Sequence, residues 1–323
     1  MIHQFTRLSG VISLKDLHIG NCKTVTTLIE GIEQDNKHLE ELQIEGCHDP
    51  TFVFRGHPPA SLKRLDVRNC EKLQCLLDTS PSCNLEDLYV QDCPSLTCVL
   101  SSIHQLVHLS IKKCSMLTNF LLPTVVTYLE IEECSELTTL ILPRDQLPEK
   151  LGSLKISWCP KLESTVERFH NNTDLYEIWI VGCEKLKSIP DGLHTLSSLA
   201  DIRISYCASL VSFPQGGHKL YETLEEVGLQ NLTSLGNLSI CGLPDILSFR
   251  VEEIRISLPP NLTQLYIGHF PNLKDLSSMG LEKLTSLQWL SIHNCPHLKS
   301  LPSLPSSLLE IYKKECPLLE KKK

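Results

Sequence analysis

One fifteen-residue pattern recurs along nearly the whole 323-residue chain. A late copy, LQWLSIHNCPHLKSL (287–301), has aliphatic residues eight, five and three positions before a central cysteine, and three and six positions after it. We number each copy from this central residue, which is position zero. Thirteen segments fit the pattern, with position zero at Cys22, Cys47, Cys70, Cys93, Cys114, Cys134, Cys159, Cys183, Cys207, Leu243, Phe270, Cys295 and Cys316.

The aliphatic columns of this pattern are nearly uniform. Position minus eight is Leu in twelve segments, and position minus five is always Leu or Ile. Position minus three is Ile or Val in all segments but the last, which has Lys313. Successive segments are mostly 20 to 27 residues apart, a period typical of repeat proteins. A unit this short cannot bury its own leucines, so we expect the units to stack around a shared core.

The pattern resembles the leucine-rich repeat, in which each unit is a short strand followed by a turn and a looser return. The resemblance implies an α/β solenoid: a horseshoe with a parallel concave sheet of about 13 strands and a mostly irregular or 3-10 convex side with few short helices. Prolines before the strands, as in HPPASL (57–62) and LPEKL (147–151), also disfavour helices there. We expect one solenoid over 1–323, in which LEEVGLQNL (224–232) could add a degenerate extra turn.

Eleven of the 15 cysteines occupy position zero, where the chain turns inward and a small, weakly polar side chain fits. Stacked thiols at this position point the same way, which opposes disulfide formation. The segment HNCPH (293–297) carries metal-binding residue types, but Cys295 should turn inward while His293 points outward. We therefore predict buried thiols and no metal site.

Charge and missing motifs disfavour several classes of function. The net charge is −8 and basic residues are not clustered, which argues against nucleic-acid binding. No run approaches the roughly 18 apolar residues of a membrane span, and the first residues lack a secretory signal, so we expect a cytoplasmic chain. There is no P-loop, GxSxG or HExxH motif. We therefore predict no nucleotide-binding domain in this chain, no cofactor and no enzymatic activity.

Proline residues give the repeat a recognisable subtype. Proline follows position zero in six segments, and several segments end in an apolar residue and proline, as in SIP (188–190). The stretches LVSFPQGG (210–217) and CPHLKSLPSLPSSL (295–308) resemble the C-terminal repeats of plant intracellular immune receptors of the nucleotide-binding, leucine-rich-repeat class, in particular the coiled-coil group. The resemblance covers nearly the whole chain. It implies a non-catalytic domain that senses a pathogen effector or a guarded host protein, and that contacts and restrains the nucleotide-binding domain of the full-length receptor.

Two other classes stay open. The substrate-recruiting repeats of F-box ubiquitin ligases also have cysteine at position zero, although their returns are regular and helical. An extracellular binding domain is the third reading, because the chain has four glycosylation sequons. Their asparagines are Asn171, Asn231, Asn237 and Asn261, of which Asn237 is expected within a strand.

The candidate binding site lies on the strand positions that point away from the core. All three tryptophans and six of the seven tyrosines occupy such positions. Aromatic residues suit any pleated surface through cross-strand packing, but they also anchor protein interfaces. Aromatic residues cluster over three consecutive segments, which favours a protein-binding site on the concave face formed by Trp158, Tyr176, Trp179, Asp201, Arg203, Tyr206, Tyr266 and Trp289.

Overall fold

A computed structural model of the chain describes residues 14–21, 38–54, 58–77, 84–99, 105–142, 146–165, 169, 174–190, 192–210, 229, 232–242 and 258–320. The chain forms two compact units. The first unit comprises Met1–Leu151 and Trp158–Leu162, and the second comprises Gly152–Ser157 and Glu163–Lys323. Each unit is described by itself below.

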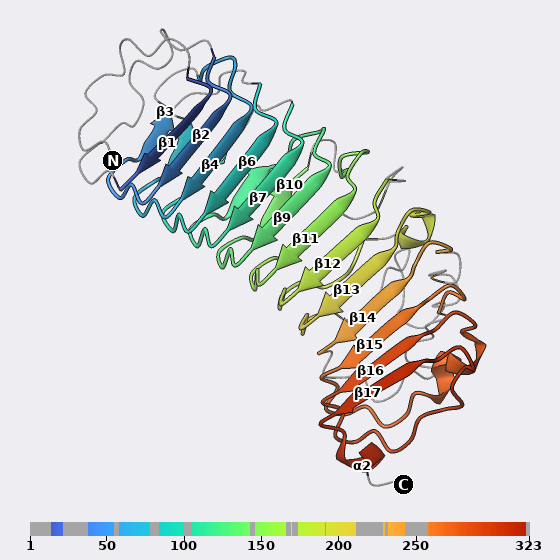
Figure 1. The fold of residues 1–323 in the computed structure, drawn as a ribbon. Helices are drawn as coiled ribbons and strands as arrows, with labels where there is room; N and C mark the ends of the chain where they lie inside the picture. The colour runs from blue at the N-terminus through green and yellow to red at the C-terminus, as the bar shows by residue number, and fades with distance from the viewer. Residues whose placement is uncertain are drawn as a thin grey trace. The chain divides into compact units, whose positions relative to one another are not determined.

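Thirteen five-residue parallel strands, one for each copy of the pattern, form the main sheet of the described residues, which confirms the predicted sheet. In the first unit these strands are β1 (Asp16–Gly20), β2 (Glu41–Glu45), β4 (Arg64–Arg68), β6 (Asp87–Gln91), β7 (His108–Lys112) and β9 (Tyr128–Glu132). In the second unit they are β11 (Ser153–Ser157), β12 (Glu177–Val181), β13 (Asp201–Ser205), β14 (Asn237–Cys241), β15 (Gln264–Gly268), β16 (Trp289–His293) and β17 (Glu310–Lys314). Figure 1 shows the strands of each unit lying side by side.

The core is built from the aliphatic columns, because alternate side chains of a strand point to opposite faces. In β12, for example, Ile178 and Ile180 are 1% and 0% exposed, and Leu175 before the strand and Cys183 after it are also fully buried. Neighbouring strands pair without any shift, so that Leu154 lies beside Ile178. Equivalent aliphatic residues therefore stack from strand to strand, as the repeat predicts.

A left-handed residue turns the chain inward after each strand. The residue at position minus one has a positive φ between 49° and 65° wherever the backbone angle is given. Glycine takes this conformation without strain, but ten of these positions are not glycine: Asn21, Asn69, Asp92, Lys113, Glu133, Trp158, Tyr206, His269, Asn294 and Glu315. The turn delivers the next residue, at position zero, to the core.

The position-zero cysteines are buried, as predicted. Every one of them among the described residues is 0% exposed, and Cys22 and Leu243 lie outside those residues. Most of these thiols donate to the carbonyl two residues earlier; the Cys93 thiol, for example, lies 3.4 Å from the Gln91 oxygen. Burial raises the pKa of Cys295 to about 12 and also raises that of Cys114. The Cys295 and Cys114 thiols therefore stay protonated at neutral pH and are poor nucleophiles.

The return segments contain little helix, as predicted. The prolines before the strands form tight turns, in which the Leu62 and Leu151 amides donate to the Pro59 and Pro148 carbonyls, both at 3.0 Å. Two pairs of short strands also run parallel on this side, β3 (Phe52–Phe54) with β5 (Cys75–Leu77) and β8 (Asn119–Leu121) with β10 (Thr139–Ile141). The helical segments are η2 (Leu193–Thr195), η4 (Ser277–Met279), η5 (Leu281–Lys283) and α2 (Pro317–Glu320).

The predicted extra turn at 224–232 lies almost entirely outside the described residues. Leu229 and Leu232 are described, and both are buried. Strand β13 pairs directly with β14, from Asp201 beside Asn237 to Ser205 beside Cys241.

Candidate functional site

The face of the main sheet opposite the core is formed by the first, third and fifth residues of each strand, and we call it the open face. The eight predicted site residues lie on it or at its margins. In the second unit some of these residues form two groups, one around Trp179 and one around Tyr266.

Trp179 is the third residue of β12, and two cations lie against its ring. The Lys155 ammonium, on β11, is 4.0 Å from the centre of the ring, and the Arg203 guanidinium, on β13, is 4.1 Å from it. The unshifted strand pairing puts both residues directly beside Trp179. Both neighbours therefore stabilise the indole by cation–π contact. The ring of Trp179 is therefore already in contact with two side chains of its own chain.

Carboxylates hold these two cations in place. Glu177 accepts hydrogen bonds from Lys155 at 3.0 Å and from Ser153 at 2.9 Å. Asp201 binds the Arg203 guanidinium through two bonds of 3.2 Å. The Glu177 and Asp201 side chains are only 14% and 16% exposed, so these pairs are shielded from solvent more than ordinary surface pairs. The group is a fixed, charge-balanced platform.

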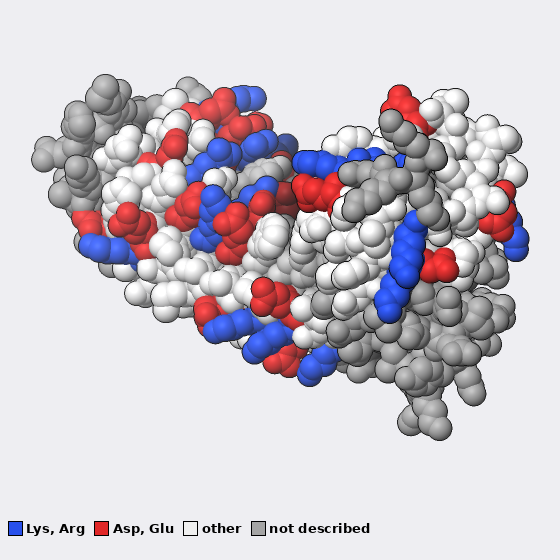
Figure 2. Space-filling view, turned by 90° about the horizontal axis from the view of Figure 1, so that it is seen from below, with Lys and Arg blue, Asp and Glu red and all other residues white. Residues whose placement is uncertain are grey.

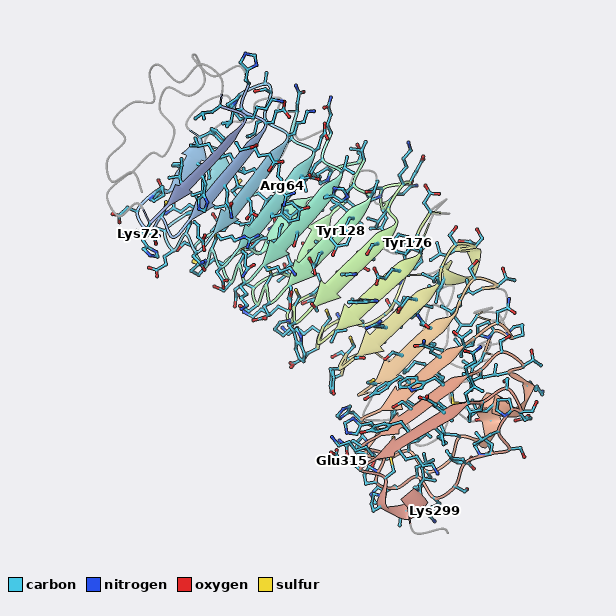
Figure 3. The ribbon with its side chains drawn as sticks, viewed as in Figure 1. Arg64, Lys72, Tyr128, Tyr176, Lys299 and Glu315 are labelled. Carbon is cyan, nitrogen blue, oxygen red and sulfur yellow. The ribbon has the colours of Figure 1, made fainter. Side chains whose placement is uncertain are left out.

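The second group joins tyrosines and histidines at the carboxyl ends of β13 to β16. The rings of Tyr206 and His269 are centred 5.2 Å apart, and those of His269 and His293 are 4.9 Å apart. The Tyr266 hydroxyl lies 3.2 Å from His293 Nδ1, and His293 Nε2 lies 3.2 Å from a Glu315 oxygen. Figure 3 labels Glu315, which follows the last residue of β17.

Burial shifts the ionisation of this second group. It raises the pKa of Tyr266 to about 12, so the phenol stays protonated. Burial, reinforced by the neighbouring His293, lowers the pKa of His269 below its ordinary value. The neutral forms of Tyr266 and His269 therefore predominate at pH 7, and both rings keep hydrogen-bonding edges.

Two glycines make room for the tyrosines. A Cβ atom on Gly268 would lie 2.7 Å from the ring of Tyr266, and one on Gly242 would lie 2.8 Å from the ring of Tyr206. Neither distance is sterically possible without movement of the ring or the backbone. The phenol rings therefore lie flat against the sheet over these glycines.

The remaining predicted residues lie at other places on the open face. Tyr176 immediately precedes β12 and is 50% exposed (Figure 3). Trp289 is the first residue of β16 and is half-buried beside Gln264. Trp158 belongs to the first unit, follows β11 in the left-handed turn and is 50% exposed. Tyr176 and Trp158 are thus the most exposed of the predicted aromatic residues.

The prediction omitted a cavity on the open face of the first unit. Its volume is about 450 Å³. It is lined by Arg68, Tyr89, Val90, Gln91, His108, Ser110, Lys112, Tyr128 and Glu130. The sequence does contain a signal for it, since Tyr89 and Tyr128 occupy outward positions in two copies of the pattern that are separated by a single copy.

Ion pairs dominate this cavity and its surroundings. Lys112 binds Glu130 at 2.9 Å and Glu132 at 3.2 Å, and Asp66, which is only 6% exposed, binds Arg68 through two bonds of 2.8 Å. Burial acts to lower the pKa of Lys112, but the two glutamates outweigh it and the pKa is raised. Figure 2 shows the same mixing of signs, with Lys and Arg side chains lying next to Asp and Glu.

Two other kinds of site, a metal centre and a membrane-spanning helix, are absent from the described parts of the chain. Within those residues no three His, Cys, Asp or Glu side chains are grouped so that they could hold a metal ion. No described helix has both the length and the apolar character needed to cross a membrane.

Comparison with known proteins shows which proteins the chain is similar to. No protein-family model matches the chain. It superposes on the leucine-rich-repeat protein LIC12759 of Leptospira interrogans with a TM-score of 0.50 and 18% identity, over 94% of this chain and 85% of the other. It is 32% identical over 299 residues to an Arabidopsis thaliana protein named "Putative disease resistance protein At3g14460". The chain therefore has the fold of leucine-rich-repeat proteins, and its sequence is similar to part of this Arabidopsis protein.

The two matches cover different shares of the proteins concerned. The match to the Leptospira protein concerns the fold of this leucine-rich-repeat chain. The match to the Arabidopsis protein covers 89% of the chain but only 20% of the relative's length.

Proposed function

We propose that this chain is the recognition domain of a plant intracellular immune receptor, and that it binds a pathogen effector or a host protein that effectors attack. The observation that carries the proposal is the 32% identity that extends over 89% of the chain to a disease resistance protein. The fold agrees with it, because a repeat sheet offers one long, rigid face for a protein partner. The proposed role is binding without catalysis.

The open face of the second unit supplies the chemistry for such binding. Tyr176 and Tyr206 are 50% and 39% exposed and can bury a large area on a partner at low entropic cost. The Trp179 platform holds charged groups in fixed positions beside them, which can orient a partner. We assign Trp179 the role of holding Lys155 and Arg203, while the exposed rings make the contacts.

The test is a pull-down from infected and healthy plant tissue with the whole chain as bait and quantitative mass spectrometry as readout. The variant Trp158→Ala/Tyr176→Ala removes the two most exposed rings among the predicted site residues. The matched control is Met116→Ala/Ile141→Ala, which removes side chains that are 54% and 47% exposed outside the main sheet. Support requires a protein that the wild type and the control capture and the aromatic variant loses by about tenfold or more. Equal capture by all three contradicts the proposal.

We further propose that the chain restrains the nucleotide switch of the full-length receptor, as the resemblance to the coiled-coil group implies. The test adds the chain in trans to the receptor's nucleotide-binding domain and follows the release of a fluorescent ADP analogue. Slower release with the chain present supports the restraint. An unchanged rate contradicts it but leaves partner recognition untouched.

An F-box ubiquitin-ligase module remains the second candidate, because it shares the buried position-zero cysteines. It predicts that the chain, with the sequence that precedes it, co-purifies with a Skp1-type adaptor. Capture of such an adaptor would replace the immune-receptor proposal.

A further inference from the structure

Strand β17 differs from every other strand of the second unit, because all five of its residues, Glu310–Lys314, are exposed. Ile311 occupies the core column at position minus five, yet it is 38% exposed. Leu309, just before the strand, is 77% exposed, and Tyr312 is 51% exposed. No described strand pairs with the far edge of β17, which is the last strand in the sheet order.

The hydrogen bonds to β16 show which groups of β17 face this free edge. The Glu310 amide donates a hydrogen bond to the carbonyl of Gln288, just before β16. The Lys314 carbonyl accepts a hydrogen bond from the amide of Asn294, just after β16. Successive residues of a strand direct their amide and carbonyl groups to alternate sides. The N–H and C=O groups of Ile311 and Lys313 therefore point away from β16, toward the free edge.

We infer that two copies of this chain associate through their β17 edges, in antiparallel order about a two-fold axis that passes beside Tyr312. Ile311 of each copy then exchanges two backbone hydrogen bonds with Lys313 of the other, which uses all the edge groups of both residues. Such a contact is isologous and closes after two copies.

The side chains favour this alignment over the alignments that are shifted by one residue. Centring the axis on Tyr312 places Glu310 of each copy opposite Lys314 of the other, on the open face, which gives two cross-strand pairs of opposite charge. Moving the axis to Lys313 would place lysine opposite lysine, and moving it to Ile311 would leave both charges unmatched. Lysine on an edge strand ordinarily prevents pairing, but here Lys313 extends its aliphatic stem along Ile311 of the other copy.

This inference is independent of the proposed function, because it concerns an edge of the sheet and not its open face. The experiment is sedimentation velocity of the whole chain across a concentration series up to about 100 μM, a range suited to weak dimers. We expect a reversible monomer–dimer equilibrium. Glu310→Lys or Lys314→Glu alone should weaken it by about tenfold or more, since each creates two like-charge contacts.

The reciprocal change separates the inference from simple loss of folding. Glu310→Lys/Lys314→Glu restores the opposite charges and should restore the dimer, whereas Lys185→Glu, an exposed lysine elsewhere, should leave it unchanged. Lys313→Pro removes a free-edge N–H but none of the bonds to β16, and it should also give monomers. A chain that stays monomeric at all concentrations, or a dimer that none of the β17 changes affects, overturns the inference.

A cross-link checks the alignment itself. In the inferred pair the two Tyr312 residues face each other as a non-hydrogen-bonded pair about 4.5 Å apart at Cα, which is within the range for a disulfide. Tyr312→Cys should therefore form a covalent dimer under mild oxidation, while Glu310→Cys should not. Cross-linking of both variants to the same extent, or of neither, contradicts this alignment.

Discussion

The open faces of strands β2 to β9 in the first unit and of strands β14 to β16 in the second are built from the same backbone but carry opposite chemistry. On β2 to β9 nine of the fifteen open-face residues are charged, and most are held in ion pairs such as Lys112 with Glu130 and Glu132. On β14 to β16 none of the nine open-face residues is Asp, Glu, Lys or Arg. Those strands present small polar residues around Tyr266 and Trp289. One repeat frame can therefore support a salt-sensitive face and a neutral aromatic face in the same chain.

The largest expected effect tests what the two units share. Leu129→Ala on β9 and Leu154→Ala on β11 each remove a buried side chain from the same core column. Each should lower the free energy of unfolding by about 2–5 kcal/mol, from lost burial and the cavity that remains. Chemical denaturation of both variants measures the loss. If one substitution is nearly neutral, the two units do not have equivalent cores.

A smaller effect distinguishes the glycines of the two faces. Gly268→Ala should cost about 1–3 kcal/mol, because the new Cβ would lie 2.7 Å from the ring of Tyr266. Gly20→Ala, at the matching strand position in the first unit, meets nothing closer than 3.5 Å and should stay within about 0.5 kcal/mol of the parent chain.

The same pair of variants can be followed by tyrosine titration at alkaline pH. Displacement of the Tyr266 ring toward water should bring its pKa down from about 12 toward the ordinary value. The Tyr266→Phe variant identifies which part of the absorbance change belongs to this residue. A pKa that stays at its raised value in Gly268→Ala would mean that the glycine does not hold the ring in place.

Salt concentration should change the stability cost of substitutions on the charged face and not on the neutral face. Glu130→Gln removes the partner of Lys112 and should cost about 1 kcal/mol or less at low salt, since both side chains are partly exposed. At about 1 M salt that cost should shrink, because ions screen the pair. Ser239→Ala on β14 should cost about 0.5 kcal/mol or less at either salt concentration. A cost for Glu130→Gln that does not depend on salt would remove the electrostatic distinction between the faces.

The smallest expected effect concerns pH and only the second unit. The folded pKa of His269 lies below its unfolded value, so the unfolded chain binds a proton more readily. The stability that neutral His269 contributes is fully present above the unfolded pKa of about 6.5, and it is lost as the pH falls below that value and through the lower folded pKa.

Hydrogen exchange of the β15 amides at pH 7 and pH 5 measures this change. Exchange should become modestly faster at pH 5 in the parent chain, where protonated His269 also faces His293, Tyr206 and Glu315. The variant His269→Phe keeps an aromatic ring and should lose the pH dependence. Equal acceleration in parent and variant would assign the pH effect to another group.

Much of the fold follows from the columns of the repeat. The uniform Leu, Ile and Cys columns fixed the number of main strands, their parallel order and the residues of the core, because only one alternation of side chains buries all the aliphatic positions. The left-handed turn before position zero was not foreseen, since residues as different as Trp158 and Lys113 occupy it. Side-chain identity carries little information where the backbone of the repeat imposes the conformation.

The candidate site also combines features that the sequence predicts with features that only the structure shows. The sequence by itself determined that aromatic and charged residues lie on the face opposite the core, because strand periodicity assigns each side chain to one face. Only the tertiary structure decided that Lys155 and Arg203 cover Trp179, that Gly268 makes room for Tyr266 and that ion pairs surround the cavity beside Tyr89. The cation–π contacts of Trp179 join different strands, and all of these contacts depend on which strands pair or on the rotamers chosen after pairing. Spacing along the chain cannot specify either.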